Sequence, residues 1–216
     1  MLERFGIDYC CGGKNTLAEA CARRQVEIAP VLEELEHWDG DTNTPEAQWQ
    51  NGSFKELTQY IVEKHHAFAL RQLELLRNLS AKVERRHGDK HPELFEVSTA
   101  IAAISTELMH HFFCEEHLLF PYLAKLEVDP QLAPTPVFGS VEQPITRMMI
   151  DHDHTGNELR LLREITVNYR LPADACTTYR ALYRALEDLE QDLHQHIHLE
   201  NNILFPRALA QAKEKA

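Results

Sequence analysis

Apolar residues recur every three to four positions along four long stretches of this chain, which is the pattern of helices that bury one face. The stretches cover about 53–86, 93–126, 144–169 and 174–210. Gly88 and Pro92 bracket the first break, three prolines place a loop over 127–141, Pro144 fits a first helical turn, and Pro172 marks the last connection. Short connections between stripes of this kind predict an all-α four-helix bundle that runs up and down.

Residues 1–40 differ in character and are expected to form a small helical N-terminal domain. Thr16 and Glu19 have the spacing of a capping box, which predicts a short helix from Thr16 to about Ile28. Pro30 is expected to interrupt it, with another turn or two of helix over 31–38. Polar turn-forming residues then predict a linker over 41–53, so that the bundle occupies 54–212.

Each apolar stripe carries one histidine, and two stripes also carry a glutamate. The histidines are His66, His111, His152 and His196, and the glutamates are Glu115 and Glu200. In the first stretch a competing stripe carries His65, but Gln72 in its middle makes us prefer His66. A charge on a buried seam is costly unless it is paired or bound to a metal. For a lone seam histidine, such as His66 or His152, a purely structural role in the core explains the pattern equally well.

The two glutamates belong to a repeated frame, HxxxExxxLFP, which starts at His111 and returns at His196, 85 residues later (196 − 111). On a helix, side chains at i and i+4 lie on one face, so each copy presents an imidazole and a carboxylate together. Packing alone does not explain the repetition of so long a frame. We interpret the Leu-Phe-Pro endings as structural, closing each helix end with an apolar contact.

Four imidazoles and two carboxylates are too many ligands for one tetrahedral zinc ion. The residues therefore predict two metal ions, each held by two histidines and bridged by Glu115 and Glu200. Nitrogen and oxygen donors without sulfur suit iron or manganese, and redox-active iron is favoured. A bridging oxide or hydroxide would bring the charge of two divalent ions and two carboxylates near zero. The dominance of histidine favours a centre that binds small gases or passes on electrons or iron.

The remaining histidines are weaker candidates. His65, His110, His194 and His198 flank the proposed ligands and are expected to point away from the site, whereas His154 could support a ligand from behind. His87 lies 21 residues beyond His66 (87 − 66), roughly 30 Å along a helix, and is out of reach. Asp151 and Glu107 could orient ligands through hydrogen bonds, although a solvated side chain explains Asp151 as well.

The chain has five cysteines, an odd number, and its start lacks the pattern of a signal peptide, so we expect reduced thiols and a cytoplasmic protein. Cys10 and Cys11 are adjacent, which disfavours a disulfide between them. Glycines and a helix N-terminus nearby favour thiolates that bind metal or react with oxidants, although a tight turn of small residues is an alternative. Cys21, Cys114 and Cys176 are expected to be buried small apolar residues.

The net charge and the hydropathy of the chain argue against some classes of binding partner. The formal net charge is −12, which argues against nucleic acid and against acidic membrane surfaces. No stretch approaches the roughly 20 uninterrupted apolar residues of a membrane span.

The segment Asp8-Tyr-Cys10-Cys11-Gly12-Gly13-Lys-Asn-Thr-Leu-Ala-Glu-Ala-Cys21, followed by a bundle with two HxxxE…LFP frames, resembles the iron-sulfur cluster repair di-iron proteins, also called the RIC or ScdA type. The resemblance covers nearly the whole chain. It implies a hemerythrin-like bundle with two non-haem irons, in which the six seam residues match the iron ligands and Cys10 and Cys11 match a vicinal thiol pair. The stretch from Lys82 to His87 also matches. Asp151 stands where glutamate is common, and the loop over 127–141 is longer.

The resemblance implies a protein of the bacterial cytoplasm that repairs iron-sulfur clusters, or re-supplies their iron, under nitric oxide or oxidative stress. Its partners would be apo or damaged iron-sulfur proteins, with Cys10 and Cys11 as a thiol relay. Two alternatives remain open at this point, an enzyme that reduces nitric oxide and a hemerythrin-like carrier or sensor of nitric oxide or dioxygen. The acidic surface and the N-terminal arm also leave a homodimer open.

Overall fold

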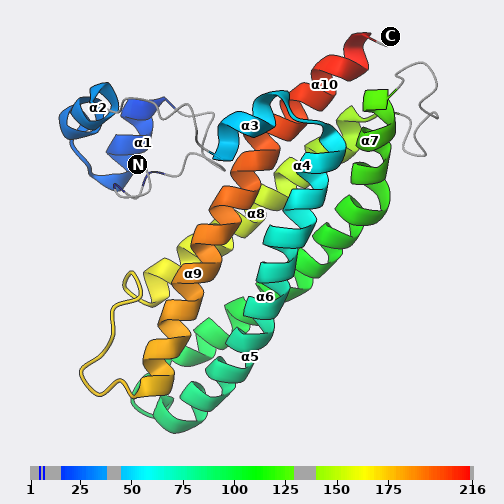
Figure 1. Cartoon of the computed structure of the whole chain (residues 1–216). Helices are drawn as coiled ribbons and strands as arrows, with labels where there is room; N and C mark the ends of the chain where they lie inside the picture. The colour runs from blue at the N-terminus through cyan, green and yellow to red at the C-terminus, as the bar shows by residue number, and fades with distance from the viewer. Residues whose placement is uncertain (1–4, 6, 8–15, 38–44, 129–139, 215–216) are drawn as a thin grey trace.

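The computed structural model describes residues 5, 7, 16–37, 45–128 and 140–214. Over these residues the regular structure is entirely helical, and four long helices pack side by side (Figure 1). This confirms the predicted all-α bundle. Among the described helices, none combines the length and the apolar character needed to cross a bilayer.

Each long helix except the third is interrupted by a π-helical turn. The bundle elements, in chain order, are α4 Phe54–Tyr60, η2 Ile61–His66 and α5 Ala67–His87; α6 Glu93–Cys114, η3 Glu115–Leu119 and α7 Phe120–Val128; α8 Glu142–Ile165; and α9 Thr177–Leu199, η4 Glu200–Leu204 and α10 Phe205–Glu214. The first helix begins at a capping box, in which the Ser53 side chain accepts from the N–H of Glu56. Pro144 lies in the first turn of α8, as predicted.

Two apolar clusters fill the bundle, and a polar layer separates them along every helix. One cluster includes Ala69, Phe112, Leu159 and Leu193, and the other includes Ile61, Leu119, Met148 and Ile203. On each helix the seam histidine falls between a member of the first cluster and a member of the second. The polar side chains are therefore enclosed by core above and below rather than placed at an end of the bundle.

A π-helical turn precedes the proline of each repeated frame. Phe120 donates its N–H to the carbonyl of Glu115, and Phe205 donates to that of Glu200, so each bond spans five residues. Pro121 and Pro206 follow directly. In a regular α-helix a proline ring collides with the carbonyl four residues earlier, and a widened turn relieves that collision. The helices continue as α7 and α10, so the expectation that Leu-Phe-Pro closes each helix end is wrong.

The third helix ends at Ile165, four residues before the predicted end near Tyr169. Val167, Asn168 and Tyr169 have φ values of 51°, 57° and 55°, which form a left-handed turn. The Tyr169 hydroxyl donates to Glu190 Oε2 at 2.9 Å, and Arg163 Nε donates to Oε1 of the same carboxylate at 2.6 Å. This buried contact on α9 holds the turn, and periodicity alone cannot reveal it.

The N-terminal helices form a small unit with a core of Ile7, Cys21 and Val31. Helix α1, Leu17–Arg24, begins at the predicted capping box of Thr16 and Glu19 and ends at Gln25, whose φ is 55°. Helix α2, Ile28–Glu36, contains Pro30 in its first turn, where no N–H is needed, so the expectation that Pro30 interrupts a helix is wrong.

A short helix, α3 Pro45–Asn51, lies within the stretch predicted as a linker. Cys10 and Cys11 lie outside the described residues, so the predicted thiol pair has no structural account. Cys21 is buried as predicted, but Cys176 is exposed, because it is the N-cap residue of α9 rather than a core position.

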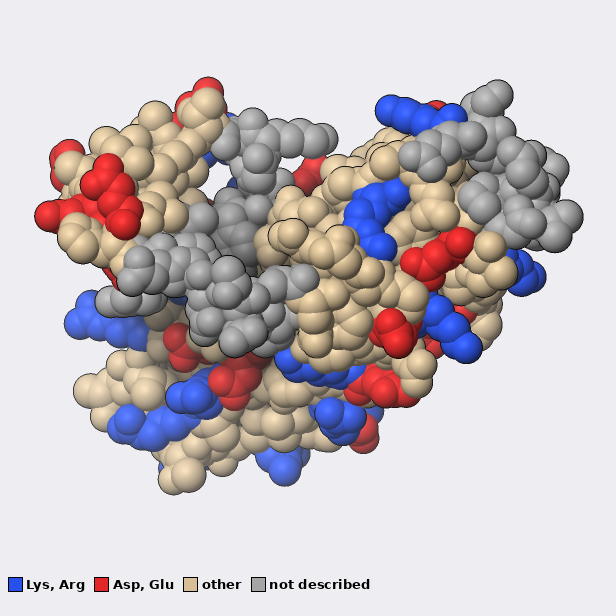
Figure 2. All heavy atoms as spheres, turned by 45° about the horizontal axis from the view of Figure 1, so that its top comes forward, with Lys and Arg blue, Asp and Glu red and all other residues tan. Residues whose placement is uncertain are grey.

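On the face of the molecule in Figure 2, basic side chains are scattered among acidic ones over the bundle.

Candidate metal centre

The structure brings together the six seam residues, and each is at most 3% exposed. They come from all four long helices: His66 ends η2, His111 lies in α6, Glu115 begins η3, His152 lies in α8, His196 lies in α9 and Glu200 begins η4. The i, i+4 spacing of the two frames places each imidazole beside its own glutamate. The fold then sets the two frames face to face.

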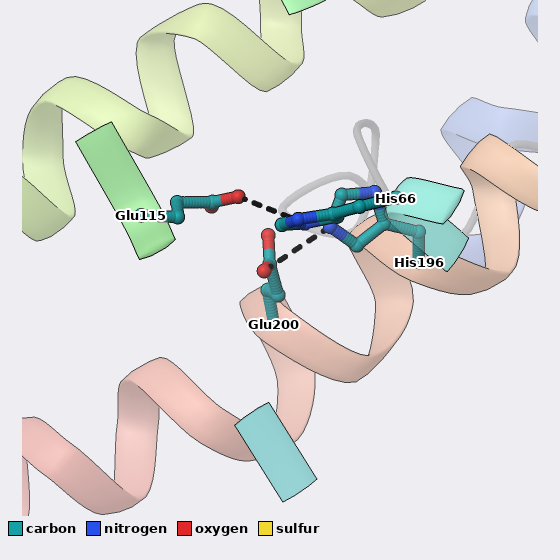
Figure 3. A group of neighbouring side chains, drawn as sticks. All are labelled: His66, Glu115, His196 and Glu200. Atoms are coloured by element: carbon teal, nitrogen blue, oxygen red, sulfur yellow. Dashed lines mark ion pairs between the residues drawn. The ribbon is translucent and has the colours of Figure 1, made fainter. Parts of the chain in front are cut away.

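The six side chains divide into two groups of four that share their carboxylates. One group is His66, His196, Glu115 and Glu200, shown in Figure 3, and the other is His111, His152, Glu115 and Glu200. Within each group one ligand atom from every residue lies within 4.8 Å of the others. Each group is the size of a coordination sphere for one ion.

Each glutamate turns one oxygen toward each group. Glu115 Oε2 lies 3.3 Å from His66 Nε2, and its Oε1 lies 3.0 Å from His111 Nε2. Glu200 Oε1 lies 3.1 Å from His196 Nε2, and its Oε2 lies 3.0 Å from His152 Nε2. Ligands about 2.1 Å from one ion and at right angles to each other lie about 3 Å apart. These separations therefore fit two ions bridged by both carboxylates.

Most polar atoms of the centre lack a hydrogen bond within the described part of the chain. Both carboxylate oxygens of Glu115 and of Glu200, Nε2 of His66 and both ring nitrogens of His196 are buried and make none. The short contacts given above do not have hydrogen-bond geometry. A buried carboxylate left in this state is costly, on the order of several kcal/mol, unless a cation satisfies it. The donor set therefore fits a metal centre better than a structural core.

Burial and the neighbouring charges shift the pKa values of the candidate ligands. Burial alone would raise the pKa of the Glu115 and Glu200 carboxyls, but the facing imidazoles hold both pKa values below the ordinary range. Burial opposes the charged form of His111, yet Glu115 and Asp151 outweigh it and raise the pKa of His111 to about 10. Complete burial lowers the pKa of His196. The centre thus favours ionised carboxylates, the form that binds cations.

Two orienting residues hold equivalent places in the repeated frames. Glu116 follows Glu115 and lies 2.7 Å from Nδ1 of His66, while Asn201 follows Glu200 and lies 2.9 Å from Nδ1 of His152. Each contact leaves Nε2 of the imidazole facing the centre. Sequence reasoning missed both residues. Their shared position directly after the glutamate of each frame was the available signal.

The phenylalanines of the Leu-Phe-Pro endings pack on the same two histidines. Phe120 stacks on the His66 ring at 6.0 Å, and Phe205 stacks on the His152 ring at 6.0 Å. The two halves of the bundle thus repeat one arrangement, in which a frame from one helix supplies a histidine, a glutamate, an orienting residue and an aromatic ring. The Leu-Phe-Pro ending serves the centre as well as the core.

His65 does not point away from the centre, as the sequence suggested. It is fully buried, its Nδ1 lies 3.0 Å from Asp192 Oδ1, and its ring stacks on His196 at 5.9 Å. In the π-helical turn that ends at His66 both neighbours are buried, His65 beside Asp192 of α9 and His66 beside Glu116 of η3. Asp151, which the sequence suggested could orient a ligand, lies 3.7 Å from Nδ1 of His111 and 3.0 Å from Nε of Arg147, so the ligand that it faces is His111.

A cavity of about 340 Å³ reaches His111 from outside the bundle. Its lining comes from α6 and α8 and comprises Thr106, Glu107, His110, His111, Arg147, Asp151, His154 and Thr155. Glu107 and His154, which the sequence suggested as supporting residues, thus line this approach. His111 is itself part of the lining, so the cavity adjoins one of the two ligand groups.

Comparisons with known proteins agree with this architecture. Residues 57–208 match the protein family described as the hemerythrin HHE cation binding domain. Residues 1–39 match a family described as a domain of unknown function. The chain is 36% identical over 209 residues to the iron-sulfur cluster repair protein YtfE of Musicola paradisiaca (strain Ech703), covering 97% of this chain and 89% of that protein. It is 34% identical to the proteins of the same name from Yersinia pseudotuberculosis, over 209 residues, and Escherichia coli O157:H7, over 212 residues, covering 97% of this chain and 90% of each.

Proposed function

Because the chain belongs to the family of iron-sulfur cluster repair proteins with a hemerythrin-type bundle, we propose that it is a di-iron protein that repairs clusters damaged by nitric oxide or oxidative stress, or re-supplies their iron. His66 and His196 would hold one iron, His111 and His152 the other, and Glu115 and Glu200 would bridge the two. Iron bound in this way would supply redox chemistry, and it could be transferred to another protein.

One observation carries this proposal: each buried carboxylate turns one oxygen toward each pair of histidines, at 3.0–3.3 Å. A single ion would use only one side of each carboxylate and would leave the other histidine pair without a cation. Four nitrogens and four oxygens without sulfur suit iron. Four imidazole donors are neutral when they bind, so the protein contributes only the two negative charges of the glutamates.

The iron content of the purified chain tests the number of ions. We expect about two irons per chain after anaerobic loading. Glu115→Ala and Glu200→Ala should each bring the content close to zero, because each removes a ligand from both groups. Glu96→Ala changes an exposed glutamate on α6 and should keep the full content. One iron per chain in the unaltered protein would contradict the di-iron assignment.

Repair is tested separately, by incubating the di-iron form with an apo iron-sulfur protein and a sulfide source. The absorbance of the restored cluster should exceed that of a control with the same amount of free iron. A Cys10→Ser, Cys11→Ser double variant examines the thiol relay, and it should keep its iron while restoring fewer clusters. Recovery no better than with free iron would count against repair.

The cavity beside His111 favours a second candidate, the reduction of nitric oxide to nitrous oxide or its reversible binding. Two molecules of nitric oxide, two electrons and two protons give one nitrous oxide and one water, and two ferrous ions hold the electrons required. Headspace gas after anaerobic addition of nitric oxide distinguishes the outcomes. Nitrous oxide would indicate turnover, and intact nitric oxide released on purging would indicate a carrier or sensor.

A further inference from the structure

A second cluster of ligand-type side chains lies at the far end of the bundle from α10, where α5 ends and α9 begins (Figure 1). His87 is the last residue of α5, His91 lies in the turn before α6, Asp174 lies in the loop before α9, and Cys176 is the N-cap of α9. These residues belong to none of the apolar clusters. They supply two imidazoles, one carboxylate and one thiol, which is the donor set of zinc-type sites.

The four side chains already meet in pairs. Nε2 of His87 lies 3.3 Å from Cys176 Sγ, and Nε2 of His91 lies 2.9 Å from Asp174 Oδ1. Both imidazoles stand edge-on against the buried ring of Tyr179, at 5.4 Å and 5.7 Å between ring centroids. Because that ring is fixed in the core, it holds the two histidines on the same side of the helix end.

The outer contacts prepare the cluster for a cation. Asp174 Oδ1 lies 2.9 Å from Nε2 of His91 and Glu93 Oε1 lies 3.1 Å from its Nδ1, and these carboxylates raise the pKa of His91, so an ion bound at Nε2 replaces a proton. The backbone N–H of Tyr179 lowers the pKa of the Cys176 thiol, which favours the thiolate. Carboxylate and thiolate together bring two negative charges to one place, the number that a divalent ion neutralises.

We propose that His87, His91, Asp174 and Cys176 form a second metal site, for a zinc-type divalent ion. Ligand atoms around one tetrahedral ion lie about 3.5 Å apart, close to the 3.3 Å of the thiol pair. The two pairs stand apart in the structure, with donor atoms of no three of these residues within 4.8 Å of one another and with 6.3 Å between the imidazole centroids, so binding has to draw the two pairs together. The ion takes the place of the protons that bridge each imidazole to its acidic partner, and binding releases them.

Cobalt(II) added to the iron-loaded chain under anaerobic conditions provides the test, because a thiolate bound to cobalt gives a charge-transfer band. The iron centre contains no sulfur, so the band reports on cysteine alone. We expect the band in the unaltered chain and its loss in Cys176→Ser. His91→Ala should raise the dissociation constant at least about tenfold, the smallest loss expected when even an outer-shell partner is removed. Zinc should displace the cobalt and abolish the band.

Two controls separate this site from other thiols and from misfolding. The Cys10→Ser, Cys11→Ser double variant should keep the band, and His37→Ala, which changes an exposed histidine on the N-terminal unit, should keep the affinity. Circular dichroism and iron content should match the unaltered chain in every variant. The proposal is overturned if no band forms, if Cys176→Ser keeps it, or if the Cys10, Cys11 variant loses it.

Discussion

Glu116 and Asn201 occupy the same place in the two halves of the bundle, and each accepts a hydrogen bond from the histidine of a neighbouring helix. One is an acid and the other an amide, so the orienting function needs an acceptor oxygen rather than a charge. This distinction matters because a rotated imidazole would turn its donor nitrogen away from the centre. The two residues therefore set the orientation of the imidazole ligands rather than the charge of the site.

Replacing these acceptors should weaken metal binding without unfolding the chain. We expect Glu116→Ala and Asn201→Ala each to lower iron affinity by about 10–100-fold, the usual cost of losing an outer-shell partner. Glu116→Gln keeps an acceptor oxygen and should retain most of the affinity. Competition with a chromophoric chelator measures the change. Equal losses in Glu116→Gln and Glu116→Ala would show that charge, not orientation, is the important property.

At this scale the sequence revealed the candidate site but not its surroundings. A repeated HxxxE frame marks the glutamates and two histidines because spacing on one helix is visible in sequence. The pairing of His66 with Glu116, and of His65 with Asp192, joins residues that are 50 and 127 positions apart. Such contacts depend on how the helices are rotated against each other, which a single sequence does not show.

Among the elements, the widened turns η3 and η4 connect the site to the prolines that follow it. The helix pattern placed the four long helices correctly, because their apolar stripes are long and regular. The pattern could not reveal the extra residue in the π-helical turn of each frame, because the helix faces before and after that turn are both buried. The same limitation explains the early end of α8, which a tertiary contact to Glu190 determines.

Deleting Leu118, an exposed residue of η3, makes Phe120 the fourth residue after Glu115, so that its existing bond becomes an α-helical one. The flanking faces keep their orientation, but Pro121 then lies in a regular helix, which should cost about 3 kcal/mol of unfolding free energy. Adding Pro121→Ala should recover most of this loss. Urea unfolding measures both variants.

The matched control for this deletion is loss of Met109, an exposed residue in the regular part of α6. It rotates everything that follows by roughly 100°, so it should abolish cooperative unfolding whether or not Pro121 is present. Equal damage from the two deletions, or no recovery on adding Pro121→Ala, would contradict the role given to the widened turn.

The link between α8 and α9 through Tyr169 should depend on pH. Burial and the charge of Glu190 raise the pKa of Tyr169 above its ordinary value. Since the folded pKa exceeds the unfolded one, this contribution to stability is complete below about pH 10 and is lost as the pH rises further. Tyr169→Phe should cost about 1–3 kcal/mol at neutral pH by leaving an oxygen of Glu190 unpaired. Denaturant unfolding from about pH 8 to about pH 11 should show a flatter decline in this variant.

At the scale of the whole molecule, the candidate metal centre joins all four helices between two apolar clusters. The uncompensated carboxylates and imidazoles cost stability in the absence of a cation, and a bound cation favours only the folded chain. Metal content and thermal stability should therefore rise and fall together.

Removing the metal should lower the melting temperature. With free ion at about 100 times its dissociation constant, binding adds about 2.7 kcal/mol, which corresponds to roughly 5–10 °C for a chain of this size. Thermal scans followed by circular dichroism, with and without a chelator, measure the shift. A Glu115→Gln, Glu200→Gln double variant should show little dependence on the chelator. A chelator effect as large as in the unaltered chain would place the stabilising ion elsewhere.

Each group of four ligands takes two residues from the first half of the bundle and two from the second, and Glu200 in the last helix belongs to both groups. A nascent polypeptide that has left the ribosome only as far as α8 already carries His66, His111, Glu115 and His152, yet it cannot complete either group. If the centre holds iron as proposed, a complete ligand group forms only after translation of the last helix, and truncated products would carry no iron.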